Sequence, residues 1–418
     1  MLIKKIIVEN FYGVKNLIEV DFTEGGKIDK TGYFNLNDDV RISLINGFYG
    51  ANASGKSTIL NVIDVVIRLM IVKQSEFILS SNGLKMDNTL LLPNFSEGMQ
   101  LKPTKLGIDF TINKNDYSYV IHVTNSGKDI EKEVLLKNGK NVFIREGGRV
   151  VFNGNLSKKI AKVFENITAP KNSSFLSVVL DDNSDVSVFG NIKELLEISE
   201  LKQIQNKVCF ITDKRSVQLG QGNVSGLMLV AIKYINDNTI NKEEYLKGIN
   251  TLVKYFEPNF KTLVIKNDGK NSIEYAAEYE NFYKKLAVTE LSAGTRELIA
   301  YIDQILKILR TGGVVVYDET SKYYHPDMEI AILNLFRDKD INRNNAQIFF
   351  SSHNHETFDL LHNNQAYIME KDADVITVNS VSEYDVKERD NIKRRYRLGS
   401  LGGVPDTIDF NRIINNLL

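Results

Sequence analysis

The chain has 418 residues, of which 43% are hydrophobic and 25% are charged, and this composition excludes a largely disordered chain. The 52 lysines and arginines almost equal the 53 aspartates and glutamates, so a net charge of −1 gives no general basic field for nucleic acid. The single cysteine, Cys209, excludes an internal disulfide and a cysteine-based metal cluster, which fits a reducing compartment.

The N-terminal residues predict neither a secretion signal nor a membrane anchor. Residues 1–10 lack a long apolar core and a small-residue cleavage site. The most apolar helical stretch, residues 62–72, is interrupted by Asp64 and Arg68, whereas a membrane helix needs roughly 20 apolar residues. We therefore expect a cytoplasmic protein without a membrane partner.

A glycine-rich loop lies between strands and a helix near the N-terminus. Three runs rich in Ile, Val and Leu predict strands, namely residues 2–8, 17–22 and 41–46. The glycine-rich residues 47–57 follow the third run. Apolar side chains then recur at helical spacing from Ile59 to Met70. The order predicts a strand–loop–helix unit.

The middle of the chain differs from both ends. Residues 104–153 alternate apolar and polar side chains between turn signals, which predicts an antiparallel β lobe. Residues 156–257 are predicted to be mainly helical, and residues 259–289 return to strand-like alternation. Beyond these, helix and strand alternate over residues 296–309, 314–317, 328–336 and 347–351. We therefore predict one α/β nucleotide-binding head, split by an inserted β-plus-α lobe, with parts 1–75, 76–285 and 286–418.

Residues 50–57 match the phosphate-binding pattern G-x-x-x-x-G-K-[ST] between a predicted strand and helix. The glycines let backbone N–H groups turn inward around an anion, and the next helix directs its N-terminus at the phosphates. Lys56 is expected to reach the β- and γ-phosphates of ATP, and the Ser57 hydroxyl to bind Mg²⁺. The predicted nucleotide-binding residues of this loop are Gly50, Asn52, Ser54, Gly55, Lys56, Ser57 and Thr58.

Four apolar residues, 314–317, end in the two carboxylates of Asp318 and Glu319. Beside a phosphate-binding loop, the first acid is expected to assist Mg²⁺ and the second to polarise the attacking water. The alternative is an ordinary strand that ends in solvated acids.

Two further candidates have a structural alternative each. Ser292 precedes a predicted helix, so it is either an N-cap or, with Gly294, a donor to the γ-phosphate held by another subunit. His353 follows a predicted strand, where it is either structural or a contact of the γ-phosphate.

The ordered set of these motifs resembles the ABC-type ATPase heads of the SMC, Rad50 and RecF group. It comprises Asn10-Phe11, the loop 50–57, the segment 291–294, Asp318-Glu319 and His353. More narrowly, the chain resembles the AAA15-type ATPases, also called AbiLii-like or COG1106-like, of abortive-infection and PARIS-type antiphage systems. Three segments carry this narrower likeness, namely residues 323–326, 352–354 and 395–405. The resemblance covers about residues 1–70 and 285–410.

The resemblance implies the roles of the site. Residues 50–57 correspond to Walker A, Asp318 and Glu319 to Walker B with the catalytic acid, Ser292 and Gly294 to the signature motif, and His353 to the switch histidine. Two subunits would enclose ATP and Mg²⁺ head to tail. The signature departs from that of transporters at Ala293 and Thr295. No Q-loop glutamine is placed, although Gln74 and Gln100 are candidates.

The predicted function is an antiphage ATPase, a sensor and scaffold that controls a separate toxic effector, such as a Toprim-like nuclease, in response to a phage-derived trigger. The alternative is a RecF- or Rad50-like DNA-repair ATPase, although the sequence lacks heptads for long coiled-coil arms. An OLD-type nuclease would need a Toprim domain. A transporter ATPase is conceivable, but the signature and the tail do not favour it. The basic run 393–397 is either a solvated helix face, an assembly contact or a contact with a nucleic-acid backbone.

Overall fold

The computed structural model describes residues 1–26, 30–71, 93–94, 96–124, 129–155, 158, 171–180, 196–211, 217–218, 223–224, 242–267, 273–287, 290–320, 325–387 and 390–404. Within these ranges, no helix is both long and apolar enough to cross a bilayer.

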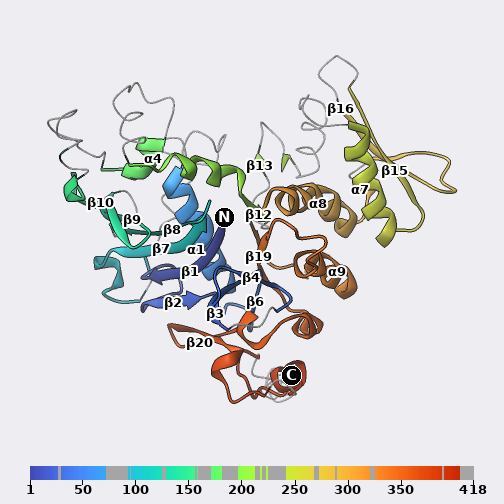
Figure 1. Cartoon of the computed structure of the whole chain (residues 1–418). Coiled ribbons are helices and arrows are strands. Elements are labelled where there is room, and N and C mark those ends of the chain that lie inside the picture. Colours follow the sequence, from blue (N-terminus) through green and yellow to red (C-terminus); the bar gives the residue numbers. More distant parts are fainter. Residues whose placement is uncertain are drawn as a thin grey trace.

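A six-stranded sheet forms the centre of the fold (Figure 1). Its order is β12 (Val208–Ile211), β18 (Val314–Tyr317), β19 (Gln347–Ser351), β6 (Ile45–Tyr49), β20 (Ala366–Asp372) and β21 (Val375–Ser380). The first five strands are parallel, and β21 returns antiparallel to β20. Strands β6, β18 and β19 are buried throughout, as expected for parallel strands covered on both faces.

Alternate residues of one strand enter two different hydrophobic cores. Val314 and Val316 of β18 pack in the core that contains α1 (Lys56–Ile71). Val315 and Tyr317 pack in the core that contains α8 (Ala293–Thr311) and α9 (Pro326–Arg337). The parallel sheet therefore separates α1 from α8 and α9, as the side-chain period of two in a strand requires.

A seven-stranded antiparallel sheet covers the other side of α1. Its order is β11 (Arg149–Phe152), β10 (Lys140–Glu146), β9 (Ile130–Lys137), β8 (Asn115–Val123), β7 (Thr104–Ile112), β1 (Leu2–Glu9) and β2 (Ile18–Asp21). The short helix α4 (Phe175–Leu180) and the 3₁₀ helix η3 (Ser199–Asn206) join the same core. The antiparallel strands predicted for residues 104–153 are thus present.

The boundaries predicted at residues 76 and 285 do not separate structural units. Strand β7 pairs with β1 over seven register positions, from Leu2–Thr111 to Glu9–Lys105, and β12 pairs with β18. Residues 104–152 and 208–211 are therefore parts of the head, although they lie in the predicted insertion. Alternation of apolar side chains predicts a strand but does not reveal which sheet edge the strand joins.

One part of the predicted insertion does form a sheet of its own. Strands β15 (Phe260–Asn267), β16 (Ile273–Tyr279) and β17 (Leu286–Ala287) pair antiparallel beside α7 (Lys242–Phe256), which packs on α8 (Figure 1). We call α7 with β15–β17 the α7 unit. Within the range predicted to be mainly helical, η3 is a 3₁₀ helix, whereas β12 is a strand of the parallel sheet. The predicted turn at Asp268-Gly269 lies outside the described residues.

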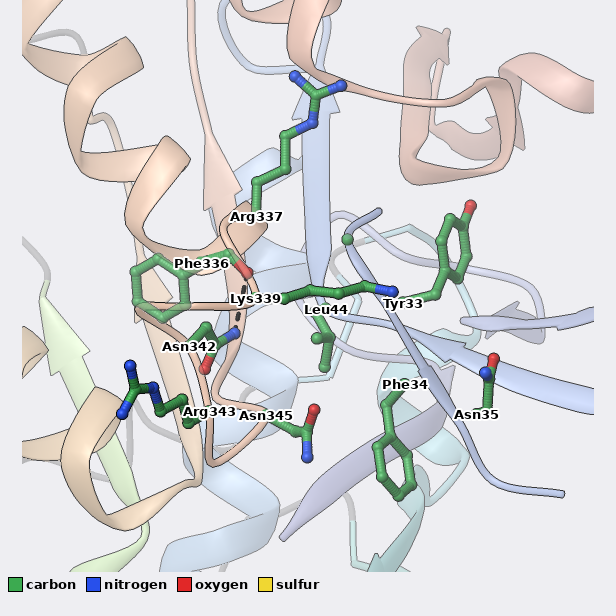
Figure 2. Close-up of a pocket in the computed structure, with 11 residues that line it drawn as sticks. Tyr33, Phe34, Asn35, Leu44, Phe336, Arg337, Lys339, Asn342, Arg343 and Asn345 are labelled. Carbon is green, nitrogen blue, oxygen red and sulfur yellow. Dashed lines mark hydrogen bonds between the residues drawn. The ribbon is translucent and has the colours of Figure 1, made fainter. Parts of the chain in front are cut away.

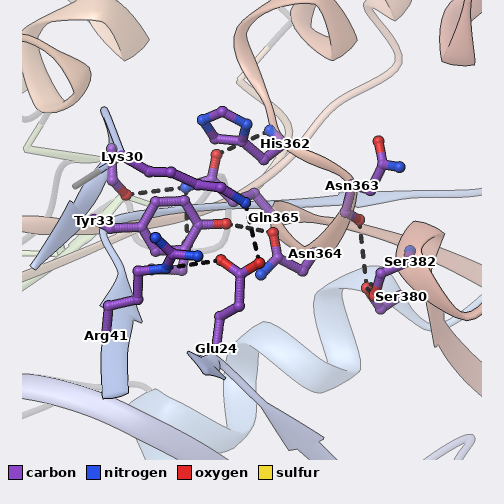
Figure 3. A network of polar contacts seen from close by, with 12 residues as sticks. Glu24, Lys30, Tyr33, Arg41, His362, Asn363, Asn364, Gln365, Ser380 and Ser382 are labelled. Carbon is purple, nitrogen blue, oxygen red and sulfur yellow. Dashed lines mark hydrogen bonds and ion pairs between the residues drawn. The ribbon is translucent and has the colours of Figure 1, made fainter. Parts of the chain in front are cut away.

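A second small sheet ties the N-terminal part to the C-terminal part. It contains β3 (Thr23–Gly25), β5 (Val40–Ser43) and β4 (Tyr33–Asn35). Glu24 pairs with Lys30 at 3.1 Å and with Arg41 at 3.0 Å, and the Tyr33 hydroxyl donates to Asn364 (Figure 3). The remaining elements are β13 (Val217–Gln218), β14 (Asn223–Val224), α10 (Ile392–Arg397) and the 3₁₀ helices η2 (Met99–Leu101), η5 (His355–Leu360), η6 (Asn363–Gln365) and η7 (Val381–Glu383).

Candidate active site

The loop between β6 and α1 requires glycine at two positions. A Cβ on Gly50 would lie 2.4 Å from the Met369 carbonyl oxygen, and one on Gly55 would lie 2.5 Å from the Ile376 side chain. Gly55 also has a φ of 100°, a conformation that side-chain-bearing residues rarely adopt. The loop is thus held tightly against β20 and β21.

Lys56 begins α1 and folds back over this loop. Its Nζ donates to the carbonyl oxygens of Gly50 at 2.8 Å and Ala51 at 2.9 Å. Burial lowers the pKa of Lys56, while the Asp318 and Glu319 carboxylates raise it. The residues therefore fit a phosphate group, because its oxygens would replace two neutral carbonyls with charged acceptors.

The Ser54 hydroxyl is a second group that fits a bound anion. The residue is 3% exposed, and its Oγ is buried without a hydrogen-bond partner among the described residues. Buried hydroxyl groups are normally satisfied, so an unpaired one beside Gly50 points to an acceptor that a bound ligand supplies. The chemistry of the loop therefore fits nucleotide phosphates.

Asp318 and Glu319 follow β18 at the same edge of the sheet. The Ser351 hydroxyl, at the end of the neighbouring strand β19, donates to Asp318 Oδ1 at 2.6 Å and accepts from the Glu319 backbone N–H at 2.7 Å. Glu319 itself has a φ of 58°. Ser351 therefore fixes the turn that presents both carboxylates, although sequence analysis gave it no role.

Glu329 lies beneath this turn, in the first turn of α9, and is 1% exposed. It accepts a hydrogen bond from the Thr320 hydroxyl. Burial raises the pKa of Glu329, and the Thr320, Ser352 and Asn354 side chains lower it. Glu329 thus packs under both the Asp318-Glu319 turn and the loop that carries His353. Its sequence signal, an acid near a helix N-terminus, is too common to have indicated this position.

His353 projects from the loop after β19 and is exposed. Partial desolvation of the imidazole ring lowers the pKa of His353, the Lys56 and His355 charges lower it further, and Asp318 raises it. His353, Lys56 and Asp318 therefore share one electrostatic environment at the carboxyl edge of the parallel strands. No cluster of three or more His, Cys, Asp or Glu side chains that could hold a metal occurs among the described residues, so Mg²⁺ at Ser57 and Asp318 would need nucleotide oxygens and water as further ligands.

The predicted signature residues lie at the start of α8. Ser292 is the N-cap of this helix, and its Oγ accepts from the Thr295 backbone N–H at 3.1 Å. Ser292 and Ala293 are exposed and Gly294 is half-buried. Ser292 therefore acts as an N-cap within the single chain, and in this role it stays accessible from outside the chain.

Other candidates from the sequence have local partners or lie outside the described residues. Asn10 is buried and donates to the carbonyl oxygens of Met99 at 2.9 Å and Lys102 at 2.8 Å. Gln100 is exposed in η2. Gln74, Tyr323, Tyr324 and Pro405 lie outside the described residues.

The basic run 393–397 forms α10, and acids of the same chain pair with most of its charges. Lys393 contacts Glu356 at 2.7 Å and Asp359 at 2.9 Å, and Arg395 contacts Asp390 at 3.2 Å. This pairing favours an internal role for the run over a contact with nucleic acid.

The parallel sheet, the loop between β6 and α1, the two acids after β18 and the antiparallel sheet behind α1 define an ABC-type P-loop ATPase head. Residues 45–359 match the family model described as "AAA domain, putative AbiEii toxin, Type IV TA system". The chain belongs to this family. Membership confirms the predicted fold class and the predicted P-loop ATPase, and it implies nucleotide binding.

Solved SMC head domains are among the similar structures. One bound to the C-winged helix domain of ScpA has 13% identity, a TM-score of 0.48 and coverage of 92% of this chain and 99% of that one. An SMC head domain from Thermotoga maritima has 11% identity and a TM-score of 0.42, and the match covers 91% of this chain and 99% of that one. An SMC head domain with an extended coiled coil, bound to the C-terminal domain of ScpA derived from Pyrococcus furiosus, has 13% identity and a TM-score of 0.43. This match covers 91% of this chain and 97% of that one. No curated protein matches significantly.

Proposed function

We propose that two copies of the chain bind ATP and Mg²⁺ between them, head to tail, and hydrolyse the nucleotide. Lys56 and the loop amides hold the phosphates, Ser57 and Asp318 hold Mg²⁺, and Glu319 orients the attacking water. Bound Mg²⁺ supplies positive charge to the phosphates. The observation that carries the proposal is the gathering of Lys56, Asp318 and His353 at one sheet edge, with the Glu319 backbone fixed by Ser351.

The second copy contributes Ser292 and Gly294 from the start of α8. Exposed backbone N–H groups at a helix N-terminus favour an anion, and the Ser292 hydroxyl adds a donor. Hydrolysis then requires association, because each nucleotide needs the loop of one chain and the signature of the other.

A mixing experiment tests this shared site. Ser292→Arg should abolish turnover while its own loop still binds ATP, and Lys56→Ala should lack turnover because it binds ATP poorly. A mixture of the two variants should recover part of the activity, because one composite site then has both intact faces. Subunit exchange is verified with labelled chains. A mixture as inactive as either variant, with exchange verified, contradicts the shared site.

We further propose that the ATPase is the sensor and scaffold of a bacterial antiphage system and controls a separate toxic effector, such as a Toprim-like nuclease. The family's description names a putative toxin of a toxin–antitoxin system, and this description supports a role in a system that pairs a toxic component with a controlling one. The AAA15-like segments support the narrower class. The α7 unit also exposes three large aromatic side chains, a composition typical of protein contact surfaces, at Tyr255, Phe282 and Tyr283.

The biological proposal is tested by challenging bacteria with a phage panel, with and without the neighbouring gene. Protection should need both genes and should be lost in Lys56→Ala and Glu319→Gln. Tyr283→Ser, at a side chain that is 98% exposed, should keep ATPase activity and reduce protection if a phage-derived trigger or the effector binds there. If the two ATPase variants protect as well as the parent, the RecF-like repair function replaces this proposal.

A pocket of about 310 Å³ lies at the opposite end of the parallel strands from the candidate site (Figure 2). Its lining includes Leu44, just before β6, and Asn345, just before β19. In Figure 2 the Lys339 side chain extends toward Tyr33, whereas the guanidinium groups of Arg337 and Arg343 point in other directions. The cations do not converge, so the pocket enters no part of the proposed function.

A further inference from the structure

The Ser292 hydroxyl is engaged within its own chain. Its Oγ accepts the Thr295 backbone N–H at 3.1 Å and lies 2.6 Å from the Thr295 hydroxyl oxygen. The side chain is nevertheless exposed, at the start of α8. Whether Ser292 can donate to a phosphate therefore depends on where its one proton points.

Glu257 determines the direction of that proton. The Thr295 hydroxyl donates to Glu257 Oε1, and an ionised carboxylate can only accept. A hydroxyl carries one proton, so the Thr295 oxygen must accept in its contact with Ser292. The Ser292 proton consequently points at Thr295 and is not offered to solvent.

Glu257 is held in place by the α7 unit. It follows the last residue of α7, and its Oε2 accepts from the Tyr279 hydroxyl of β16 at 2.6 Å. Burial and the Glu257 carboxylate raise the pKa of Tyr279, so this hydroxyl remains a donor. The nearby Lys254–Glu280 ion pair, at 3.1 Å, joins α7 to the residue after β16. A hydrogen-bonded chain thus runs from β16 through Glu257 to the signature, where α7 packs on α8 (Figure 1).

We infer that Glu257 is a positioning residue that keeps the Ser292 hydroxyl turned toward Thr295 and away from the neighbouring subunit's nucleotide. The inference rests on the proposed shared ATP site. Ser292 can donate to that nucleotide only after its hydrogen bond to Thr295 breaks. Displacement of the α7 unit from α8 would remove Glu257, the acceptor that sets the direction of this hydrogen bond. The α7 unit thereby restrains hydrolysis in the resting chain.

Two substitutions separate this role from simple stability. Thr295→Val removes the acceptor for the Ser292 proton and keeps the backbone N–H that caps α8. Glu257→Gln keeps the shape and introduces a donor, so the proton direction is no longer fixed. Both should raise kcat at a fixed protein concentration by roughly 2- to 10-fold, the factor associated with one hydrogen bond. KM for ATP should stay unchanged, because the other chain's loop holds the nucleotide.

Thr295→Ser is the matched control and should behave like the parent, because it retains the hydroxyl. Thermal melting of each variant shows whether the chain is folded, and a merely structural role predicts a lower kcat with a lower melting temperature. Combining Thr295→Val with Ser292→Ala should remove the gain. If Ser292→Ala alone leaves turnover intact, the Ser292 hydroxyl does not donate to the neighbouring nucleotide and the role of Glu257 is wrong, whereas the shared site is decided separately by the mixing experiment. If Ser292→Ala abolishes turnover, yet Thr295→Val and Glu257→Gln hydrolyse ATP no faster than the parent, the role of Glu257 is wrong and the shared site stands.

Discussion

Glu319→Gln is expected to bind ATP as the parent does and to hydrolyse it at least about 10²-fold more slowly. The amide preserves the shape of the side chain and loses the anionic acceptor that orients and polarises the attacking water. The turn itself should survive, because the Ser351 hydroxyl bonds to the backbone N–H of Glu319 and to Asp318. Steady-state phosphate release and nucleotide titration give the two quantities.

Asp372→Asn is a matched control for this substitution, because Asp372 is an exposed acid at the end of β20. It removes one negative charge without touching the turn and should leave turnover unchanged. If Glu319→Gln turns over at the parental rate, the water is oriented by another group. His353, which shares the environment of Lys56 and Asp318, would be the next candidate.

Lys56→Ala is expected to weaken binding of ATP–Mg²⁺ by roughly 10²-fold, because it removes charge-assisted hydrogen bonds to the phosphates from a site where Lys56 is 7% exposed. The substitution also removes the bonds from Nζ to the Gly50 and Ala51 carbonyl oxygens. A modest fall in the melting temperature without nucleotide should therefore accompany the loss of binding.

Fluorescent-nucleotide titration measures the affinity, and melting with and without ATP measures the stabilisation by ligand. Lys371→Ala, at an exposed position of β20, is the matched control and should bind ATP normally. Equal affinity of Lys56→Ala and the parent would contradict phosphate binding by the loop 50–57.

The sequence alone determined the parts of the site that depend on local order. The pattern at residues 50–57 required a strand before it and a helix after it, and β6 and α1 occupy these places. Four apolar residues before Asp318 required a buried strand, and β18 is fully buried. For Ser292, the residue before a predicted helix, the sequence left an N-cap and a donor to another subunit as alternatives, and the structure contains the N-cap. Such features follow from side-chain period and capping chemistry, which act over a few residues.

Which distant segments meet follows from the strand order and the helix packing of the folded chain. The bond from Ser351 to Asp318 exists because β18 and β19 are parallel neighbours in a register that aligns Tyr317 with Phe350. The pairing of β7 with β1 shows that residues 104–152, which the sequence assigned to an insertion, are part of the head. The contact of Glu257 with Thr295 depends on how α7 packs on α8. Strand order, register and helix packing are set by the burial of whole faces, and no single segment of the sequence carries that information.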